Sequence, residues 1–324
     1  MTHPTSPVRV ALIGARGYTG AELVKLLAGH PYFELDVVSS RSAAGREVRE
    51  VIPEAPAGLV FGDVQPTDVA RYADRIGVWV LALPNAASEA WVRAIDKHAP
   101  DALVVDLSAD HRFDDRWAYG LPEARRKALL RARRIANPGC YATAAQLALM
   151  PVVDLLEGAA NVFGVSGYSG AGTTPSPKND PEVLRDNLLP YALVGHTHEL
   201  EIRWQLGHAV YFMPHVAPFF RGITATVSMR FKEPLSLEEL KARYEERYAY
   251  EPLVTVSADA PLVRDAAYHH GAAVGGFAVD ATTSHAVVVA TLDNLLKGAA
   301  TQALQNMNLA SGFDELAGIR PLLA

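Results

Sequence analysis

Cys140 is the single cysteine of this 324-residue chain, and its neighbours favour a reactive thiol. It follows Asn-Pro-Gly and precedes "YATAAQLALM", a run that predicts a helix beginning at the cysteine. A thiol at a helix N-terminus lies near the positive end of the helix dipole and near unpaired N–H groups. These groups favour the thiolate and can hold an oxyanion. A buried, inert cysteine is the alternative that composition alone leaves open.

A cysteine nucleophile needs a side chain that handles protons, and eleven histidines are available. His196 and His198 stand together in "GHTHELE". Other candidates are His215 and the pair His269 and His270. A His-x-His pair on a strand shares one face and could bind a metal. With no second cysteine and no H-E-x-x-H motif, we expect no metal site.

Three basic residues in loop-like contexts could bind an anionic substrate: Arg112 in "DLSADHRF", Lys178 in "TTPSPKND" and Arg221 in "PFFRGI". Each stands beside Gly, Pro or Ser. The glycine-rich stretch 166–179 has the small residues needed to wrap around a ligand. An ordinary solvated side chain is the alternative for each of these charges.

A glycine-rich turn follows the first apolar run of the chain. "GARGYTG" places Gly14, Gly17 and Gly20 after a predicted strand and at the start of a predicted helix. Such a turn allows close backbone approach to a pyrophosphate, with a helix N-terminus aimed at its charge. The spacing G-x-x-G-x-x-G differs from G-x-G-x-x-G, and a turn without a ligand is the alternative.

The end of the second predicted strand selects the nucleotide. An NAD-binding chain would place Asp or Glu here to read the ribose 2′-hydroxyl. This strand ends with Ser39, Ser40, Arg41 and Ser42, a set of hydroxyls and a guanidinium that suits a 2′-phosphate. Asp36 lies within the strand and is interpreted as structural. We therefore predict NADP rather than NAD.

These residues require an α/β fold that alternates strands and helices in its first half. The predicted strands are 8–14, 33–40, 76–84 and 102–108, with helices from 18 and over 88–98. This order predicts a parallel, doubly wound sheet. Beyond about residue 160, β-rich runs are interrupted by one clear helix, 236–250, which Ser236 and Glu239 open as a capping box. A mixed or antiparallel sheet with helices on one face is expected there, followed by an amphipathic helix over 294–310.

Composition narrows the class of protein. The net charge of −6 argues against nucleic acid as the main partner. No apolar run is long enough to cross a bilayer, and "MTHPTSPVRV" has no secretory pattern. One cysteine cannot form an internal disulfide, so we expect a cytoplasmic enzyme without membrane partners.

Eight motifs in order resemble the N-acetyl-γ-glutamyl-phosphate reductase family of arginine biosynthesis. They are "GARGYTGAEL", "SSRSAAG", "VVDLSADHRF", "NPGCYAT", "SGYSGAG", "GHTHELE", "MPHVAPFFRGI" and "DNLLKGAATQALQNMNL". The resemblance covers almost the whole chain. The family is related in fold to aspartate-semialdehyde and glyceraldehyde-3-phosphate dehydrogenases.

This resemblance implies two domains and a reaction. It implies a Rossmann-type NADP-binding domain over 1–142 plus 294–324. A catalytic and oligomerisation domain over 143–293 is expected to be of the glyceraldehyde-3-phosphate dehydrogenase C-terminal type, in a homodimer or homotetramer. The implied reaction is NADPH-dependent reduction of N-acetyl-γ-glutamyl phosphate to N-acetyl-L-glutamate 5-semialdehyde with release of phosphate. Cys140 would carry the acyl group as a thioester, which accepts hydride more readily than a carboxylate.

The resemblance also implies site residues. The family's histidine pair falls on His196 and His198, with a slight preference for His198 as the acid/base. The expected substrate contacts are Arg112, Asn137, Lys178 and Arg221. The expected cofactor contacts are Gly14, Arg16, Gly17, Tyr18, Thr19, Gly20, Ser39, Arg41, Ser42, Pro84, Ser169, Gly170 and Asn294.

The chain departs from many bacterial members in two places. Asn85 in "ALPNA" replaces a histidine, which removes one candidate proton donor, and the stretch between "DHRFDD" and "NPGC" is shorter. Two alternative functions remain. One is reduction of a related acyl phosphate, either carrier-linked aminoadipyl phosphate or aspartyl phosphate. The other is a non-catalytic NADP-sensing regulator.

Overall fold

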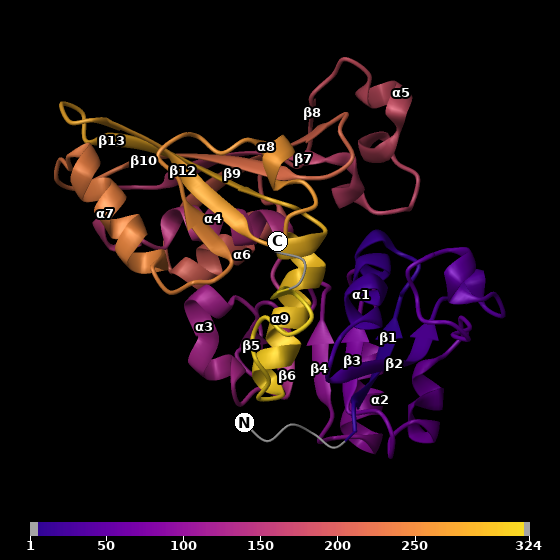
Figure 1. Cartoon of the computed structure of the whole chain (residues 1–324). Coiled ribbons are helices and arrows are strands. Elements are labelled where there is room, and N and C mark those ends of the chain that lie inside the picture. Colours follow the sequence, from indigo (N-terminus) through magenta and orange to yellow (C-terminus); the bar gives the residue numbers. More distant parts are fainter. Residues whose placement is uncertain (1–5, 321–324) are drawn as a thin grey trace. The chain divides into compact units, whose positions relative to one another are not determined.

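The computed structural model describes residues 6–320, which form two compact units (Figure 1). The first unit runs to Pro138 and resumes at Ala299, and the second is Gly139–Gly298. Both changes of unit lie a few residues from the boundaries predicted at 142/143 and 293/294. No helix within residues 6–320 combines the length and the apolar character needed to cross a membrane.

The first unit is built on a six-stranded sheet in the order β2-β1-β3-β4-β6-β5, with every neighbouring pair parallel. Its strands are β1 (Val8–Ile13), β2 (Phe33–Ser39), β3 (Val78–Leu81), β4 (Leu103–Asp106), β5 (Ala118–Tyr119) and β6 (Arg134–Ala136). Every residue of β3 and β4 is buried, as expected for strands covered on both faces. The predicted parallel, doubly wound sheet is confirmed.

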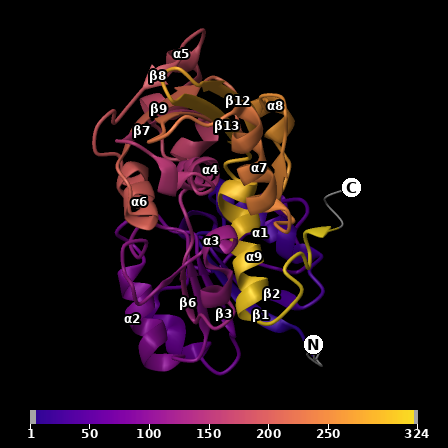
Figure 2. The same ribbon diagram turned by 90° about the vertical axis from the view of Figure 1, so that its left-hand side faces the viewer.

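Helices cover both faces of this sheet. They are α1 (Tyr18–Ala28), α2 (Glu89–His98), α3 (Pro122–Leu129) and α9 (Thr301–Ala310). Figure 2 shows α2 and α9 on opposite sides of the parallel strands. On α2 the buried Trp91, Val92 and Ile95 recur at helical spacing and pack with Trp79 of β3. The alternation of strand and helix therefore buries apolar side chains on both sides of the sheet.

The C-terminal helix differs from its prediction. An amphipathic helix was expected over 294–310, but every residue of Thr301–Ala310 is buried. The polar side chains that read as a solvent-facing stripe have partners inside the unit. Asn306 donates to the carbonyl of Gly120 at 2.8 Å and to the side-chain oxygen of Asn137 at 3.0 Å. The prediction of an amphipathic face is wrong because these amides satisfy buried acceptors instead of facing water.

The second unit is built on a seven-stranded mixed sheet in the order β11-β12-β13-β10-β7-β9-β8. Its strands are β7 (Ala160–Gly167), β8 (Leu189–Pro190), β9 (Val210–Ala217), β10 (Ile223–Arg230), β11 (Val254–Val256), β12 (Ala272–Asp280) and β13 (His285–Leu292). The pairs β7–β9 and β11–β12 are parallel, and the others are antiparallel. The predicted mixed sheet is confirmed.

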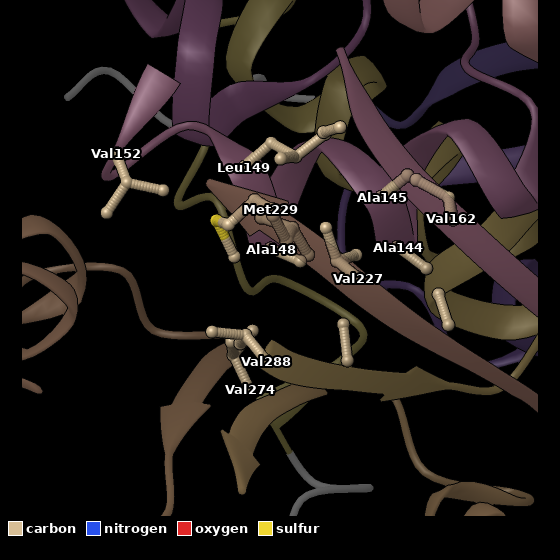
Figure 3. Packing of buried hydrophobic residues seen from close by; sticks show 14 of the residues in the cluster. Ala144, Ala145, Ala148, Leu149, Val152, Val162, Val227, Met229, Val274 and Val288 are labelled. Carbon is tan, nitrogen blue, oxygen red and sulfur yellow. The ribbon is translucent and has the colours of Figure 1, made fainter. Parts of the chain in front are cut away.

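Three helices lie on one face of the mixed sheet, below its strands in Figure 1: α4 (Cys140–Leu149), α6 (Thr197–Leu206) and α7 (Leu237–Tyr248). Two short helices, α5 (Pro181–Leu184) and α8 (Val263–Ala266), complete the unit. Figure 3 shows the core between α4 and the strands, where Ala144, Ala145 and Ala148 meet Val162 and Val227. The small alanine side chains allow α4 to lie close to the sheet. The sheet therefore holds the helix that begins with the thiol.

The capping box predicted for the 236–250 helix is confirmed at the start of α7. The Ser236 hydroxyl accepts from the amide of Glu239 at 3.2 Å. The Glu239 carboxylate accepts from the amide of Ser236 at 2.8 Å. Two of the helix's otherwise unpaired N–H groups are satisfied in this way.

Candidate active site

Cys140 is the first residue of α4, as the sequence predicts. Gly139 before it is extended, with φ −71° and ψ 146°, and its carbonyl accepts the first helical bond from Thr143 at 2.8 Å. The thiol takes part in no disulfide bond and is half-buried. It therefore lies at the positive end of the α4 dipole, where a thiolate is favoured.

A glycine packs directly against the cysteine residue. The segment Leu296–Ala300 forms a wide π-type turn, in which the amide of Gly298 donates to the carbonyl of Asp293 at 2.9 Å. A Cβ atom at Gly298 would lie 2.7 Å from the Cβ of Cys140. Sequence reasoning missed Gly298. Its only signal was a glycine inside a helical pattern, which often marks a close packing contact.

The two predicted histidines begin α6 rather than a strand, so the strand interpretation of His-x-His is wrong. His196 caps the helix, and its Nδ1 accepts from the backbone amide of His198 at 3.0 Å. A neutral ring that accepts at Nδ1 carries its proton on Nε2. The two imidazole rings lie 4.8 Å apart, and the ring of His198 lies 6.0 Å from that of Tyr141, the neighbour of the thiol.

The surroundings of His196 keep its ring uncharged. Burial, followed by the positive charge of Lys178, lowers the pKa of His196 from its usual 6.5 to about 4, while Glu199 opposes this shift. The ring of Tyr191 lies 5.5 Å from that of His196, and the Lys178 ammonium lies 4.8 Å from the centre of the Tyr191 ring. Burial raises the pKa of Tyr191, and the charge of Cys140 adds to this shift. Imidazole, phenol, ammonium and thiol therefore share one neighbourhood in the second unit.

Arg221, predicted to contact substrate, is held inside the second unit. Its guanidinium makes two hydrogen bonds to the carboxylate of Asp293, one from Nη2 at 2.9 Å, and both side chains are buried. It also lies over the ring of Tyr268, 4.3 Å from its centre. The same carboxylate accepts from the amides of Leu295 and Leu296. Arg221 thus neutralises the carboxylate that begins the π-type turn.

Arg112 and Asn137 are engaged within the first unit. Arg112 is buried, and it donates to the carbonyls of Asn137 and Leu107, both at 2.9 Å. The buried side chain of Asn137 donates to the carbonyl of Ala299 at 3.3 Å and accepts from Asn306 at 3.0 Å. Both predicted substrate residues therefore bind neighbouring parts of the fold.

The glycine-rich turn between β1 and α1 has the shape that a pyrophosphate needs. Gly14 has φ +85°, and a Cβ there would lie 2.1 Å from the carbonyl oxygen of Ala82. Gly17 is the N-cap residue of α1, and as a glycine it makes no side-chain capping bond. Gly20 faces the turn, where a Cβ would lie 2.6 Å from the oxygen of Gly14. The amides of Gly14 and Ala15 donate to the carbonyl of Ser39, and that of Gly17 donates to the carbonyl of Gly14. An anionic group at this turn would therefore meet the first amides of α1.

The serine and arginine residues after β2 differ in their exposure. The buried Ser39 donates to the carbonyl of Gly62 and accepts from the amide of Val64, both at 3.2 Å. The side chain of Arg41 is 81% exposed, and it forms an ion pair with Asp63 at 3.9 Å. The Arg41 guanidinium is thus exposed at the end of β2, whereas the Ser39 hydroxyl is already hydrogen-bonded to the backbone of Gly62 and Val64.

Asp36 is the acidic residue that could have read a ribose hydroxyl. It forms an ion pair with Arg75 at 2.9 Å. This pair supports the interpretation of Asp36 as structural. The remaining predicted cofactor residues of the first unit lie at its surface or are half-buried: Arg16, Tyr18, Thr19, Ser42 and Pro84.

Two cofactor predictions fall on buried residues of the second unit. Asn294 donates to the hydroxyl of Ser169 at 2.9 Å and accepts from the amide of Gly222 at 2.7 Å. Gly170 follows Ser169 and is exposed. The Asn294 and Ser169 pair therefore joins the start of the π-type turn to the loop after β7.

Comparisons with known proteins agree with this architecture. The family model of the semialdehyde dehydrogenase NAD-binding domain matches residues 9–132, and that of the semialdehyde dehydrogenase dimerisation domain matches residues 140–294. The N-acetyl-gamma-glutamyl-phosphate reductase of Xanthomonas campestris pv. campestris (strain B100) is 54% identical, over 97% of this chain and 98% of that protein. The chain belongs to this family. The enzyme of the same name from Stenotrophomonas maltophilia (strain R551-3) is 51% identical, over 97% of this chain and 98% of that protein.

Solved structures share the fold at low sequence identity. The aspartate semialdehyde dehydrogenase II of Vibrio cholerae, complexed with ASA, has a TM-score of 0.76 at 19% identity, over 95% of this chain and 99% of that one. The aspartate semialdehyde dehydrogenase with NADP from Candida albicans has a TM-score of 0.71 at 16% identity, over 94% of this chain and 99% of that one. The family resemblance read from the motifs is confirmed, and the chain is an oxidoreductase with a nicotinamide-nucleotide-binding domain.

Proposed function

We propose that the protein reduces N-acetyl-γ-glutamyl phosphate to N-acetyl-L-glutamate 5-semialdehyde, with release of phosphate and NADPH as the reductant. The observation that carries this proposal is the thiol of Cys140 at the start of α4, in the same neighbourhood as His196, Tyr191 and Lys178. The family's name states the substrate. The arrangement of thiol, imidazole and ammonium supplies the groups that an acyl phosphate needs.

In the first step, the Cys140 thiolate attacks the γ-acyl carbon. A C–S bond forms, the bond from that carbon to the bridging phosphate oxygen breaks, and phosphate leaves with the electron pair. The thioester that results is a better hydride acceptor than a carboxylate, which divides one difficult reduction into two easier steps. After reduction, collapse of the oxyanion expels the thiolate and gives the aldehyde.

We propose His196 rather than His198 as the histidine that acts on the reacting oxygen. Its Nδ1 is occupied by the amide of His198, so the neutral ring presents Nε2–H as a hydrogen-bond donor. The low pKa of about 4 keeps the ring neutral at physiological pH. Such a group stabilises negative charge on the acyl oxygen as it develops, and it does so without a net positive charge.

Lys178 is the basic residue we propose to hold the substrate's anionic groups. It is half-buried, and its charge reaches His196. Arg221 and Arg112 each hydrogen-bond to neighbouring parts of the fold, so we assign them the support of the turns to which they bind. We assign Asn137 the same role, because its amide binds Ala299 and Asn306.

The first unit fits a dinucleotide. At Gly14 and Gly20 of the turn a Cβ would clash with neighbouring backbone atoms, so the turn requires glycine there. The first amides of α1 would hold the pyrophosphate. When bound, NADPH supplies the hydride for the reduction. Arg41 is exposed at the end of β2 and would hold the 2′-phosphate, while Asp36 is paired with Arg75. These contacts favour NADP over NAD.

The test compares wild type with Cys140→Ser. We expect phosphate-dependent NADP⁺ reduction with N-acetyl-L-glutamate 5-semialdehyde in the wild type, and a loss of about 10³-fold or more in the variant. Near-full turnover by the serine variant would exclude the thioester. Faster turnover of aspartate semialdehyde would favour a related acyl phosphate. Tight NADP binding without turnover of either aldehyde would favour the NADP-sensing regulator.

We further propose a cytoplasmic homodimer formed through the outer face of the seven-stranded sheet. Phe163 and Tyr211 alternate with core residues of β7 and β9, are 39% and 59% exposed, and lie on the face away from α4. The match to a dimerisation domain over residues 140–294 supports an interface formed by the second unit. Light scattering should give twice the chain mass, falling to one chain in Tyr211→Glu. The single cysteine supports a reducing compartment.

A further inference from the structure

A buried glutamate reaches the turn that carries the nucleophile. Glu201 lies on α6 and is fully buried, and its Oε1 accepts from the backbone amide of Gly139 at 2.9 Å. Gly139 is the residue immediately before Cys140, and its amide is the first of the N–H groups at the start of α4. The contact joins two segments separated by 62 positions in sequence.

The same helix begins with His196. Six residues of continuous chain at the start of α6 connect the imidazole of His196 to the carboxylate of Glu201. A second buried carboxylate, that of Glu199, accepts from the amide of Phe212 at 2.9 Å and so ties α6 to β9. The helix is therefore anchored to the sheet by Glu199 and to the nucleophile turn by Glu201. Its position determines where His196 lies relative to Cys140.

We propose that Glu201 is a positioning residue for the reaction, whose carboxylate holds the Gly139 amide and thereby sets the placement of Cys140 relative to His196. A hydrogen bond from an amide to a carboxylate is shorter and stronger than one between neutral groups. The hydrogen bond to Glu201 restrains Gly139, which as a glycine would otherwise have more backbone freedom than other residues. The proposal rests on the proposed function, because it assumes that Cys140 is the nucleophile.

Three substitutions separate the possible roles of this carboxylate. Glu201→Ala removes the acceptor. Glu201→Gln keeps an acceptor oxygen and removes the charge. Glu201→Asp keeps the charge but shortens the side chain by one methylene, and it also serves if the alanine variant fails to fold. Tyr248→Phe is the matched control, because its hydroxyl donates to the carbonyl of Leu147 near the other end of α4.

The first readout is steady-state kinetics with NADPH and the acyl phosphate. We expect Glu201→Ala and Glu201→Asp to lower kcat by about 10-fold or more, with KM within about threefold, because a misplacement of about 1 Å slows chemistry by up to about 10²-fold. Glu201→Gln should recover most of kcat. Tyr248→Phe should lower Tm and leave kcat within about twofold. A lowered Tm with unchanged kcat in Glu201→Ala would make the contact merely structural and overturn the proposal.

The second readout needs no substrate. Because Cys140 is the single cysteine, the rate of iodoacetamide incorporation reports on this thiol alone. We expect slower alkylation at pH 7 in Glu201→Ala, as the thiol leaves the N–H groups of α4, and a near wild-type rate in Glu201→Gln. Faster alkylation in both variants would show that the carboxylate acts through its charge, which overturns the positioning role. If wild type reduces no acyl phosphate, the proposed function fails while this readout still tests Glu201.

Discussion

Gly298 offers a sharp test of how closely the fold packs around the thiol. The substitution Gly298→Ala adds one methyl group whose carbon would lie 2.7 Å from the Cβ of Cys140. The same carbon would lie 3.1 Å from the carbonyl oxygen of Asp293 and 3.1 Å from a methyl carbon of Leu292. The new methyl group therefore meets backbone and side-chain atoms in more than one direction, and either Cys140 or the π-type turn must shift.

The size of the effect follows from these distances. Two carbon atoms pack at about 3.5–4.0 Å, so the contact with Cys140 is short by about 1 Å. Overpacking of this kind costs about 1–3 kcal/mol of folding free energy. If Cys140 gives way, the thiol moves by a comparable distance, and a misplacement of about 1 Å lowers kcat by up to about 10²-fold. We therefore expect a large loss of rate with a moderate loss of stability.

The assay measures kcat by NADPH oxidation and the free energy of unfolding by urea denaturation. Gly29→Ala is the matched control, because within residues 6–320 its new Cβ would meet no atom closer than 4 Å beyond its chain neighbours. Its φ of −113° also suits alanine. The control should keep wild-type kcat and lie within about 0.5 kcal/mol of wild type. A wild-type kcat in Gly298→Ala would refute the argument that this glycine sets the place of the thiol.

Three further predictions concern charge. In the folded chain the pKa of His196 is about 4, whereas the ordinary value of an unfolded histidine is 6.5. Between these pH values the unfolded chain binds more protons than the folded chain, so the free energy of unfolding falls as the pH drops from 6.5 to 4. Over this pH range His196→Asn should lose about 1–3 kcal/mol less stability than wild type, as measured by urea denaturation. An equal loss in variant and wild type would contradict the lowered pKa. Arg221→Met should destabilise by about 3–5 kcal/mol because Asp293 stays buried without its partner, and a change below about 1 kcal/mol would contradict this. Arg41→Asp should raise KM for NADPH far more than for NADH, whereas equal effects would exclude the 2′-phosphate contact.

Local sequence patterns were sufficient for most of the fold. The parallel sheet followed from apolar runs alternating with amphipathic helices, since burial on both faces demands such runs. The start of α4 at Cys140 followed from Pro138 and Gly139, and the start of α7 followed from its capping box. Each of these features depends on backbone preferences and on partners a few positions away in the chain. A short stretch of sequence is therefore enough to predict it.

The motifs also contain most of the candidate site. Cys140, His196 and Lys178 stand in three separated motifs, and the fold places them around one neighbourhood of the second unit. Which histidine acts is not readable from the motif, because the answer depends on a hydrogen bond at Nδ1 and on burial.

Tertiary structure alone decided the partners of the buried polar groups. Asn306 reads as a solvent-facing residue of a helix, yet it donates to Asn137, 169 positions away. Arg221 reads as a substrate contact, yet Asp293, 72 positions away, holds its guanidinium. Glu201 stands at the end of the motif "GHTHELE", but the sequence predicted no role for it. Its contact with Gly139 exists only because α6 packs against α4. A charge or an amide in the sequence shows what can bond, whereas the fold determines which acceptor is near enough to do so.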